Sequence, residues 1–164
     1  DMKSHAKEII DAADKYGVVD LKLEAEACFV AGTTFTIENV MALLLYAESK
    51  NCAFLKEATM DYILENKSEV FKILSFADNI PGALMRDLEV AIARGERNVG
   101  GADVNVDDQY NSLRISELRK RAHEKGLNVD GSREMLIAAL KSVQEAVDGT
   151  EEGSEEFDEE PEEG

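Results

Sequence analysis

Apolar residues recur at intervals of three and four along most of the first 95 positions, a spacing that predicts helices rather than strands. Short links that are polar or contain glycine divide this region into separate helical patterns. They cover residues 3–16, 21–31, 37–50, 53–66, 69–77 and 82–95. Such helices become stable by covering one another's apolar faces, so we expect a stack of helical hairpins.

Two of these patterns carry specific expectations about single residues. In the second pattern the apolar stripe runs through Leu23, Ala27 and Val30, which we expect to face the core. Thr36 is placed to cap the third helix, and Asn39 can satisfy free backbone amides near the start of that helix.

The remainder of the chain changes character twice. Residues 96–111 lose the periodicity and contain a glycine pair with Asn and Asp, which predicts a linker. Two short helical patterns follow, at 115–125 and 132–147, and the last residues are mostly Glu, Gly and Asp, which predicts a disordered acidic tail. The predicted fold is therefore all-α, with a helical stack at 1–95, a linker at 96–111, a small helix-loop-helix module at 112–147 and the tail at 148–164.

Charge is distributed unevenly along the chain, whose formal net charge is -17. Residues 1–110 carry -9 and residues 144–164 carry -11, whereas residues 111–143 carry +3. The basic block between two acidic segments points to a local anion-binding surface, because phosphate affinity depends on local positive charge. The tail is either a solubilising terminus or a competitor that displaces nucleic acid from the basic block or attracts basic partners such as histones.

Several function classes are disfavoured by composition. Cys28 and Cys52 lie in helical patterns and are expected to be thiols in a reducing compartment, not a disulfide. No apolar run is long enough for a membrane span and no signal-peptide pattern opens the chain, which predicts an intracellular protein without membrane contact. The chain starts inside a helical pattern, as expected for a piece of a longer protein.

Catalysis is not predicted. The two histidines, His5 and His123, are far apart in sequence, and neither metal-ligand spacing nor a phosphate-binding glycine loop is present. No serine, cysteine or threonine lies in a nucleophile motif. We therefore expect a protein that is not an enzyme and that needs neither a metal nor a cofactor.

The first half of the chain resembles a known interaction domain. It is similar to the C-terminal part of a BTB/POZ domain followed by the helical extension called the 3-box, or the start of a BACK domain. The resemblance implies protein-protein assembly, often as an adaptor that recruits clients to a cullin-type ubiquitin ligase. A BTB-type dimer would need the strands and early helices of that domain, which this chain lacks. The matching positions are Ala12-Ala13-Asp14-Lys15-Tyr16-Gly17, Leu21-Lys22, Glu38-Asn39, Leu44, Ala47, Leu55-Lys56 and Asp61-Tyr62-Ile63.

The basic block resembles a SAP domain, a small helix-loop-helix motif of chromatin, RNA-processing and repair proteins. The spacing through Lys125-Gly126-Leu127 to Gly131 is the most specific part. Two positions depart from the pattern: Ala122 replaces a larger apolar residue, and Arg114 stands where a capping Thr or Ser is common. The other matching positions are Leu113, Ile115, Leu118-Arg119, Arg133, Leu136 and Leu140.

The chemistry of this block indicates phosphate contact. Ile115, Leu118 and Ala122 form one apolar stripe, and we expect Leu127, Val129, Leu136, Ile137 and Leu140 to complete a minimal core. The start of the second helix carries free N–H groups and a partial positive charge. The alternative for the Lys and Arg residues is a solvated helix face, and for His123 a plain surface position. The predicted nucleic-acid-binding residues are Arg119, Lys120, Lys125, Gly131, Ser132 and Arg133.

Together these features predict a nuclear adaptor or scaffold. Its BTB-type helices would bind protein clients, and its SAP-like module would bind DNA or RNA weakly, with A·T-rich duplex DNA favoured and little direct reading of bases. The alternative is a cytoplasmic, purely protein-binding adaptor that contacts a cullin scaffold and has no nucleic-acid role.

Overall fold

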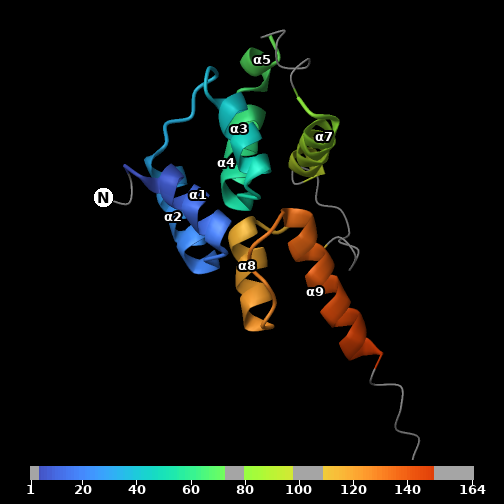
Figure 1. Cartoon of the computed structure of the whole chain (residues 1–164). Coiled ribbons are helices and arrows are strands. Elements are labelled where there is room, and N and C mark those ends of the chain that lie inside the picture. Colours follow the sequence, from blue (N-terminus) through green and yellow to red (C-terminus); the bar gives the residue numbers. More distant parts are fainter. Residues whose placement is uncertain (1–3, 73–79, 98–108, 150–164) are drawn as a thin grey trace, which may run out of the picture.

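The computed structural model describes residues 4–72, 80–97 and 109–149, and all regular elements in these ranges are helices (Figure 1). The all-α prediction is confirmed. Residues 73–79, most of the predicted linker and the acidic tail from residue 150 lie outside the described ranges. The helices are α1 Ala6–Tyr16, α2 Val19–Gly32, α3 Val40–Ser49, α4 Ala53–Glu65, α5 Lys67–Val70, α7 Gly82–Arg97, α8 Ile115–Glu124 and α9 Arg133–Asp148.

Helix α4 is the centre of the fold and packs against α2, α3, α5, α7 and α8. Figure 1 shows α3 and α4 between the α1–α2 pair on one side and α7 on the other, with α8 and α9 beyond their ends. We call α1 to α7 the helical stack. One of its apolar clusters joins α3, α4, α5 and α7, and includes Leu44, Ile63, Leu84 and Leu88. The other joins α1, α2, α3 and α4, and includes Ile10, Ala25, Ala47, Cys52 and Leu55.

The start of α3 is fixed by two side chains that bond each other's backbone. The amide of Asn39 donates to Oγ1 of Thr36 at 3.2 Å, and the amide of Thr36 donates to Oδ1 of Asn39 at 2.9 Å. This reciprocal arrangement gives the Thr36 amide an acceptor and adds a side-chain acceptor to the Asn39 amide, which also donates to the Thr36 carbonyl at 3.2 Å. The predicted capping roles of both residues are confirmed.

Helix α2 buries a different face from the one that its apolar stripe predicts. Leu23 and Val30 are only half-buried and Ala27 is exposed. The buried residues are instead Lys22, Ala25 and Glu26. The prediction was wrong because the charged side chains of Lys22 and Glu26 are buried against partners on other helices. Apolar periodicity carries no information about such buried charges.

Glu26 is fully buried and links α2 to the first turn of α4. One carboxylate oxygen, Oε1, accepts hydrogen bonds from the amides of Phe54 at 2.8 Å and Leu55 at 3.0 Å. Cys52, the residue before α4, offers no side-chain cap, so Glu26 supplies the cap from another helix. Burial, reinforced by the nearby charge of Glu26, raises the pKa of the Cys52 thiol to about 12, and neither cysteine forms a disulfide.

Lys56 connects α4 to α3 and α7. Its ammonium bonds Glu48 of α3 at 2.7 Å and also Asp87 of α7. Burial lowers the pKa of Lys56, but the hydrogen bonds to Asp87 and Glu48 and the charges of these carboxylates together raise it more, so the net pKa lies above its ordinary value. Lys56 therefore stays charged while it holds three helices together.

Replacing Glu26 tests its capping role. Glu26→Ala leaves two buried amides without an acceptor and removes a buried charge, and we expect the free energy of unfolding to fall by about 3 kcal/mol or more. Glu26→Gln keeps an acceptor oxygen and should cost less. Urea unfolding measures both, with Glu24→Ala as the control because Glu24 is exposed on the same helix. A loss in Glu26→Ala no larger than in the control would contradict the role.

Candidate nucleic-acid interface

Helices α8 and α9 form a small unit with its own core. Ile115, Leu118, Ala122, Leu136 and Leu140 are buried, and the loop residues Leu127 and Val129 pack against them, as the sequence pattern predicts. Additional core members come from outside the predicted module boundaries. These are Ala53 and Phe54 of α4 and Tyr110, whose hydroxyl donates to Oε1 of Gln144 at 2.8 Å.

Two glycines shape the connection between these helices. Gly126 has φ +67° where the chain leaves α8, a conformation that L side chains rarely adopt. Gly131 has φ +126°, and an added Cβ would lie 3.3 Å from Sδ of Met135. Next to it, Ser132 caps α9 by accepting the amide of Met135 at 3.3 Å. Both glycines and the cap are therefore needed for the local backbone path.

Helix α8 receives its N-terminal cap from the helical stack. Arg114 precedes the helix and has no capping side chain, and the amide of Ile115 donates to Oε2 of Glu57 on α4 at 2.9 Å. The departure at position 114, where a capping Thr or Ser is common in the resembled motif, is thus compensated by a carboxylate from another helix. A carboxylate also favours the positive end of the helix dipole.

Arg114 itself binds the same part of α4. Its guanidinium donates to both carboxylate oxygens of Asp61, at 3.1 and 2.6 Å, and its Nε lies 3.1 Å from Oε1 of Glu57. The hydrogen bonds to Asp61 are the main reason that the pKa of Arg114 lies above its ordinary value. The Arg114 side chain is 59% exposed, so its two hydrogen bonds to Asp61 orient the guanidinium more than they stabilise the fold.

Arg119, a predicted nucleic-acid ligand, points into the helical stack. Its NH2 group lies 2.9 Å from Oε2 of Glu26, and the two side chains are 14% and 0% exposed. Glu26 therefore caps α4 with one oxygen and pairs with α8 through the other. A pair this deeply buried leaves the Arg119 head group little access to a phosphate.

The turn before α9, including the predicted contacts Gly131, Ser132 and Arg133, is also held against the stack. Asp130 accepts hydrogen bonds from Lys22 of α2 at 3.1 and 3.2 Å. Within its own unit, Arg133 donates to the carbonyl of Asn111, before α8, at 2.8 Å. One Arg133 nitrogen also lies 3.5 Å from Oε2 of Glu57. The expected phosphate site at this turn is thus next to carboxylates of the same chain.

Lys22 is the buried cation of this contact. It is 2% exposed and bonds Asp14 of α1 at 2.8 Å as well as Asp130. Burial lowers the pKa of Lys22, but the hydrogen bonds to Asp14 and Asp130 and the charges of these carboxylates together raise it more, so the net pKa is above its ordinary value. The stabilisation from Lys22 is therefore complete below about pH 10.5 and is lost only as the pH rises through its higher folded pKa.

The remaining predicted ligands, Lys120 and Lys125, are exposed. Among the ion pairs of the described residues neither lysine takes part. His123 is exposed as well, as expected for a surface position. The six predicted ligands thus divide into two accessible lysines and a group of four that lies at or beside the contact with the helical stack.

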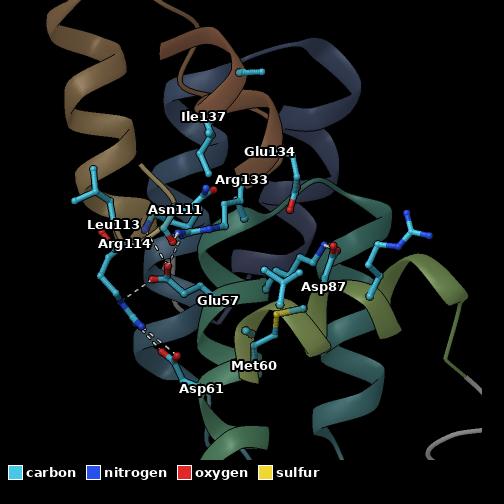
Figure 2. A pocket seen from close by; sticks show the side chains of 18 of the residues that line it. Glu57, Met60, Asp61, Asp87, Asn111, Leu113, Arg114, Arg133, Glu134 and Ile137 are labelled. Carbon is cyan, nitrogen blue, oxygen red and sulfur yellow. Dashed lines mark hydrogen bonds and ion pairs between the residues drawn. The ribbon is translucent and has the colours of Figure 1, made fainter. Parts of the chain in front are cut away.

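An open cleft of about 680 Å³ lies beside that contact (Figure 2). It is bounded by α4, α7, the residues before α8 and the first turns of α9. Figure 2 shows Arg114 and Arg133 pointing toward Glu57 and Asp61 at one side of it, with Met60, Leu113 and Ile137 among the apolar lining residues. The α8–α9 unit and the stack are therefore joined by polar contacts and by the apolar contacts of Ala53 and Phe54, beside an incompletely filled space.

Sequence reasoning missed the acidic half of this arrangement. Glu26, Glu57 and Asp61 belong to helical patterns in which they resemble ordinary solvated carboxylates. The one available signal was the absence of a capping residue at Arg114, which required an acceptor from elsewhere. Within the described ranges no cluster of His, Cys, Asp and Glu is arranged to bind a metal ion, and none of the helices there combines the length and apolarity that a membrane crossing requires.

Comparison with known protein families gives a match for the α8–α9 unit. Residues 109–143 match the SAP domain family, so the chain contains a SAP domain there, and the match includes Tyr110 of the core. No family match supports the BTB/POZ and BACK resemblance of the first half. No curated protein and no solved structure matches the chain.

Replacing Glu57 tests the cap that the stack supplies to α8. Glu57→Ala removes the acceptor of the Ile115 amide and the carboxylate beside Arg114 and Arg133, and we expect a loss of about 1 to 2 kcal/mol in the free energy of unfolding. Glu57→Gln retains an oxygen for the amide and should lose less. Denaturant unfolding provides the measurement, and Glu65→Ala, exposed at the end of the same helix, is the control. Equal stabilities of Glu57→Ala and wild type would exclude the cap.

Proposed function

We propose that the protein is a non-enzymatic scaffold that binds nucleic acid through its SAP domain, with A·T-rich duplex DNA as the favoured ligand. The SAP domain at residues 109–143 is the observation that carries this proposal. Exposed Lys120 and Lys125 support it, because two cations without ion-pair partners in the described chain are available to phosphate. A nuclear location agrees with such a role, and a cytoplasmic one is the alternative.

The expected binding mode is electrostatic and weak. In the structure as described, Lys120 and Lys125 are the accessible members of the predicted set, so the number of phosphates neutralised is small. The logarithm of the association constant should therefore fall with the logarithm of salt concentration with a slope of about -2. Binding should depend little on base sequence beyond groove shape, because lysine contacts to phosphate carry no base information.

The role of the helical stack as a protein-binding adaptor stays a prediction, as does contact with a cullin scaffold. It rests on the sequence resemblance alone. If the α8–α9 unit served only protein binding, the chain would show no salt-sensitive association with DNA. That result would favour the adaptor without a nucleic-acid role.

Charge reversal of the exposed lysines tests the proposed function. The full chain with Lys120→Glu and Lys125→Glu should lose its binding to an A·T-rich duplex at about 50 mM salt, as followed by fluorescence anisotropy. Arg119 and Arg133 are unsuitable targets because a Glu at either position would face Glu26 or Glu57 and disturb the fold.

The matched control reverses Lys67 and Lys72, which are exposed on the helical stack and change the net charge by the same amount. It should bind as wild type does. Equal loss in the two double variants would assign the effect to net charge, and absence of binding by wild type at low salt would overturn the proposed function.

A further inference from the structure

Three arginines of the SAP domain face three carboxylates of the helical stack. We call Arg114, Arg119 and Arg133 the arginine face, and Glu26, Glu57 and Asp61 the acidic face. Every arginine has at least one carboxylate within 3.5 Å, and the closest oxygens lie at 2.6, 2.9 and 3.5 Å for the three residues in order. These three arginines of the SAP domain are thus paired with carboxylates of the same chain.

The acidic face offers the same chemistry as a nucleic-acid backbone. Phosphate is recognised by arginine guanidinium groups and by free N–H groups at a helix N-terminus. Glu57 receives both kinds of donor, from the Ile115 amide and from the side chains of Arg114 and Arg133. Its carboxylate oxygens therefore satisfy donors that a phosphate oxygen would otherwise accept.

We propose that the acidic face of the stack and nucleic-acid phosphate compete for the arginine face, so that the docked SAP domain is a low-affinity state. This inference rests on the proposed function, since it concerns the regulation of that same binding site. Displacement of the stack by nucleic acid adds three arginine contacts to the two exposed lysines. In the wild type the docked state prevails and binds through the two lysines, so the arginine contacts add to the affinity only through the fraction of molecules that are undocked.

The interface has the composition of a reversible contact. Its apolar part on the stack side consists of Ala53 and Phe54, which pack on the SAP core. The cleft of about 680 Å³ leaves the space among α4, α7 and α9 unfilled. Undocking exposes Ala53 and Phe54 and breaks the Lys22–Asp130 pair, while the broken arginine–carboxylate pairs are replaced by arginine–phosphate pairs of the same kind.

Lys120 and Lys125 give nucleic acid a first contact with the docked state. Both are exposed while the arginine face is covered. Association through these lysines raises the local concentration of phosphate beside the arginine face, in the manner of a second, intramolecular binding event. Competition is thus expected to respond to the length of the nucleic acid as well as to salt.

Neutralising the acidic face tests the competition in the full-length chain. Glu57→Gln with Asp61→Asn keeps the shape of both side chains and leaves an amide oxygen for the Ile115 amide, while it removes the charges that hold Arg114 and Arg133. Affinity for an A·T-rich duplex at about 50 mM salt should rise about three- to tenfold. The slope of log association constant against log salt should steepen by about two, one phosphate for each released arginine.

The matched control is Asp20→Asn with Glu69→Gln, which removes two exposed carboxylates that form no ion pair with the arginine face. It changes net charge equally but releases no arginine, so its salt slope should equal that of wild type. If the double variant at the acidic face fails to fold, Asp61→Asn alone applies, because the Asp61 side chain is 39% exposed. That single variant should steepen the slope by about one.

The outcomes separate this inference from the function on which it rests. Tighter binding with a steeper slope in the acidic-face variant alone supports competition. Binding by all variants with one common slope overturns competition and leaves the proposed function standing. Absence of binding by wild type and by every variant overturns both.

Discussion

One buried carboxylate determines how the two parts of this protein meet. Glu26 is fully excluded from solvent, and a charged group in that position is stable only if its oxygens are satisfied. One oxygen accepts the first amides of α4 and the other pairs with Arg119 of the SAP domain. Because Glu26 lies on α2, this single side chain fixes α2, the start of α4 and α8 relative to one another. The position of the SAP domain on the stack follows from a cap that α4 needs in any case.

Glu57 supplies a second cap of the same kind. It lies on α4 and caps α8, as Glu26 lies on α2 and caps α4. Each cap comes from a neighbouring helix, so a helix end and an interface are stabilised by the same atoms. The SAP domain is therefore held by ion pairs of both signs and by a helix cap, with Ala53 and Phe54 as apolar contacts on the side of the stack. We expect the arginine–carboxylate pairs of a domain docked in this way to respond to competing anions and to salt.

Much of the fold could be predicted from the sequence, because apolar periodicity reports which side of a helix is buried against apolar neighbours. The core of Ile115, Leu118 and Leu136 and the reciprocal cap of Thr36 and Asn39 follow from local spacing, and both are confirmed. The buried face of α2 could not be predicted, since the burial of Lys22 and Glu26 depends on Asp130 and Arg119, which are distant in sequence. For the same reason the candidate site was predicted as four cations with the Gly131–Ser132 turn, and their carboxylate partners were not. Lys120 and Lys125 are exposed, whereas Arg119 and Arg133 have carboxylate partners that only the tertiary structure brings near.

The distance between the stack and the SAP domain, measured with and without nucleic acid, tests competition most directly. Spin labels at Leu45 of α3 and Ser142 of α9, both exposed, report it by pulsed electron paramagnetic resonance in a chain whose two cysteines are replaced by alanine. Without nucleic acid the docked state predicts a single narrow distance distribution. Saturation with an A·T-rich duplex should shift that distribution when the chain also carries Glu57→Gln and Asp61→Asn, because phosphate then displaces the stack from Arg114 and Arg133. The wild-type sequence, whose docked state binds through Lys120 and Lys125, should keep its distribution. A distribution that stays unchanged in the variant while the duplex is bound would show that nucleic acid uses another surface and that the acidic face does not compete.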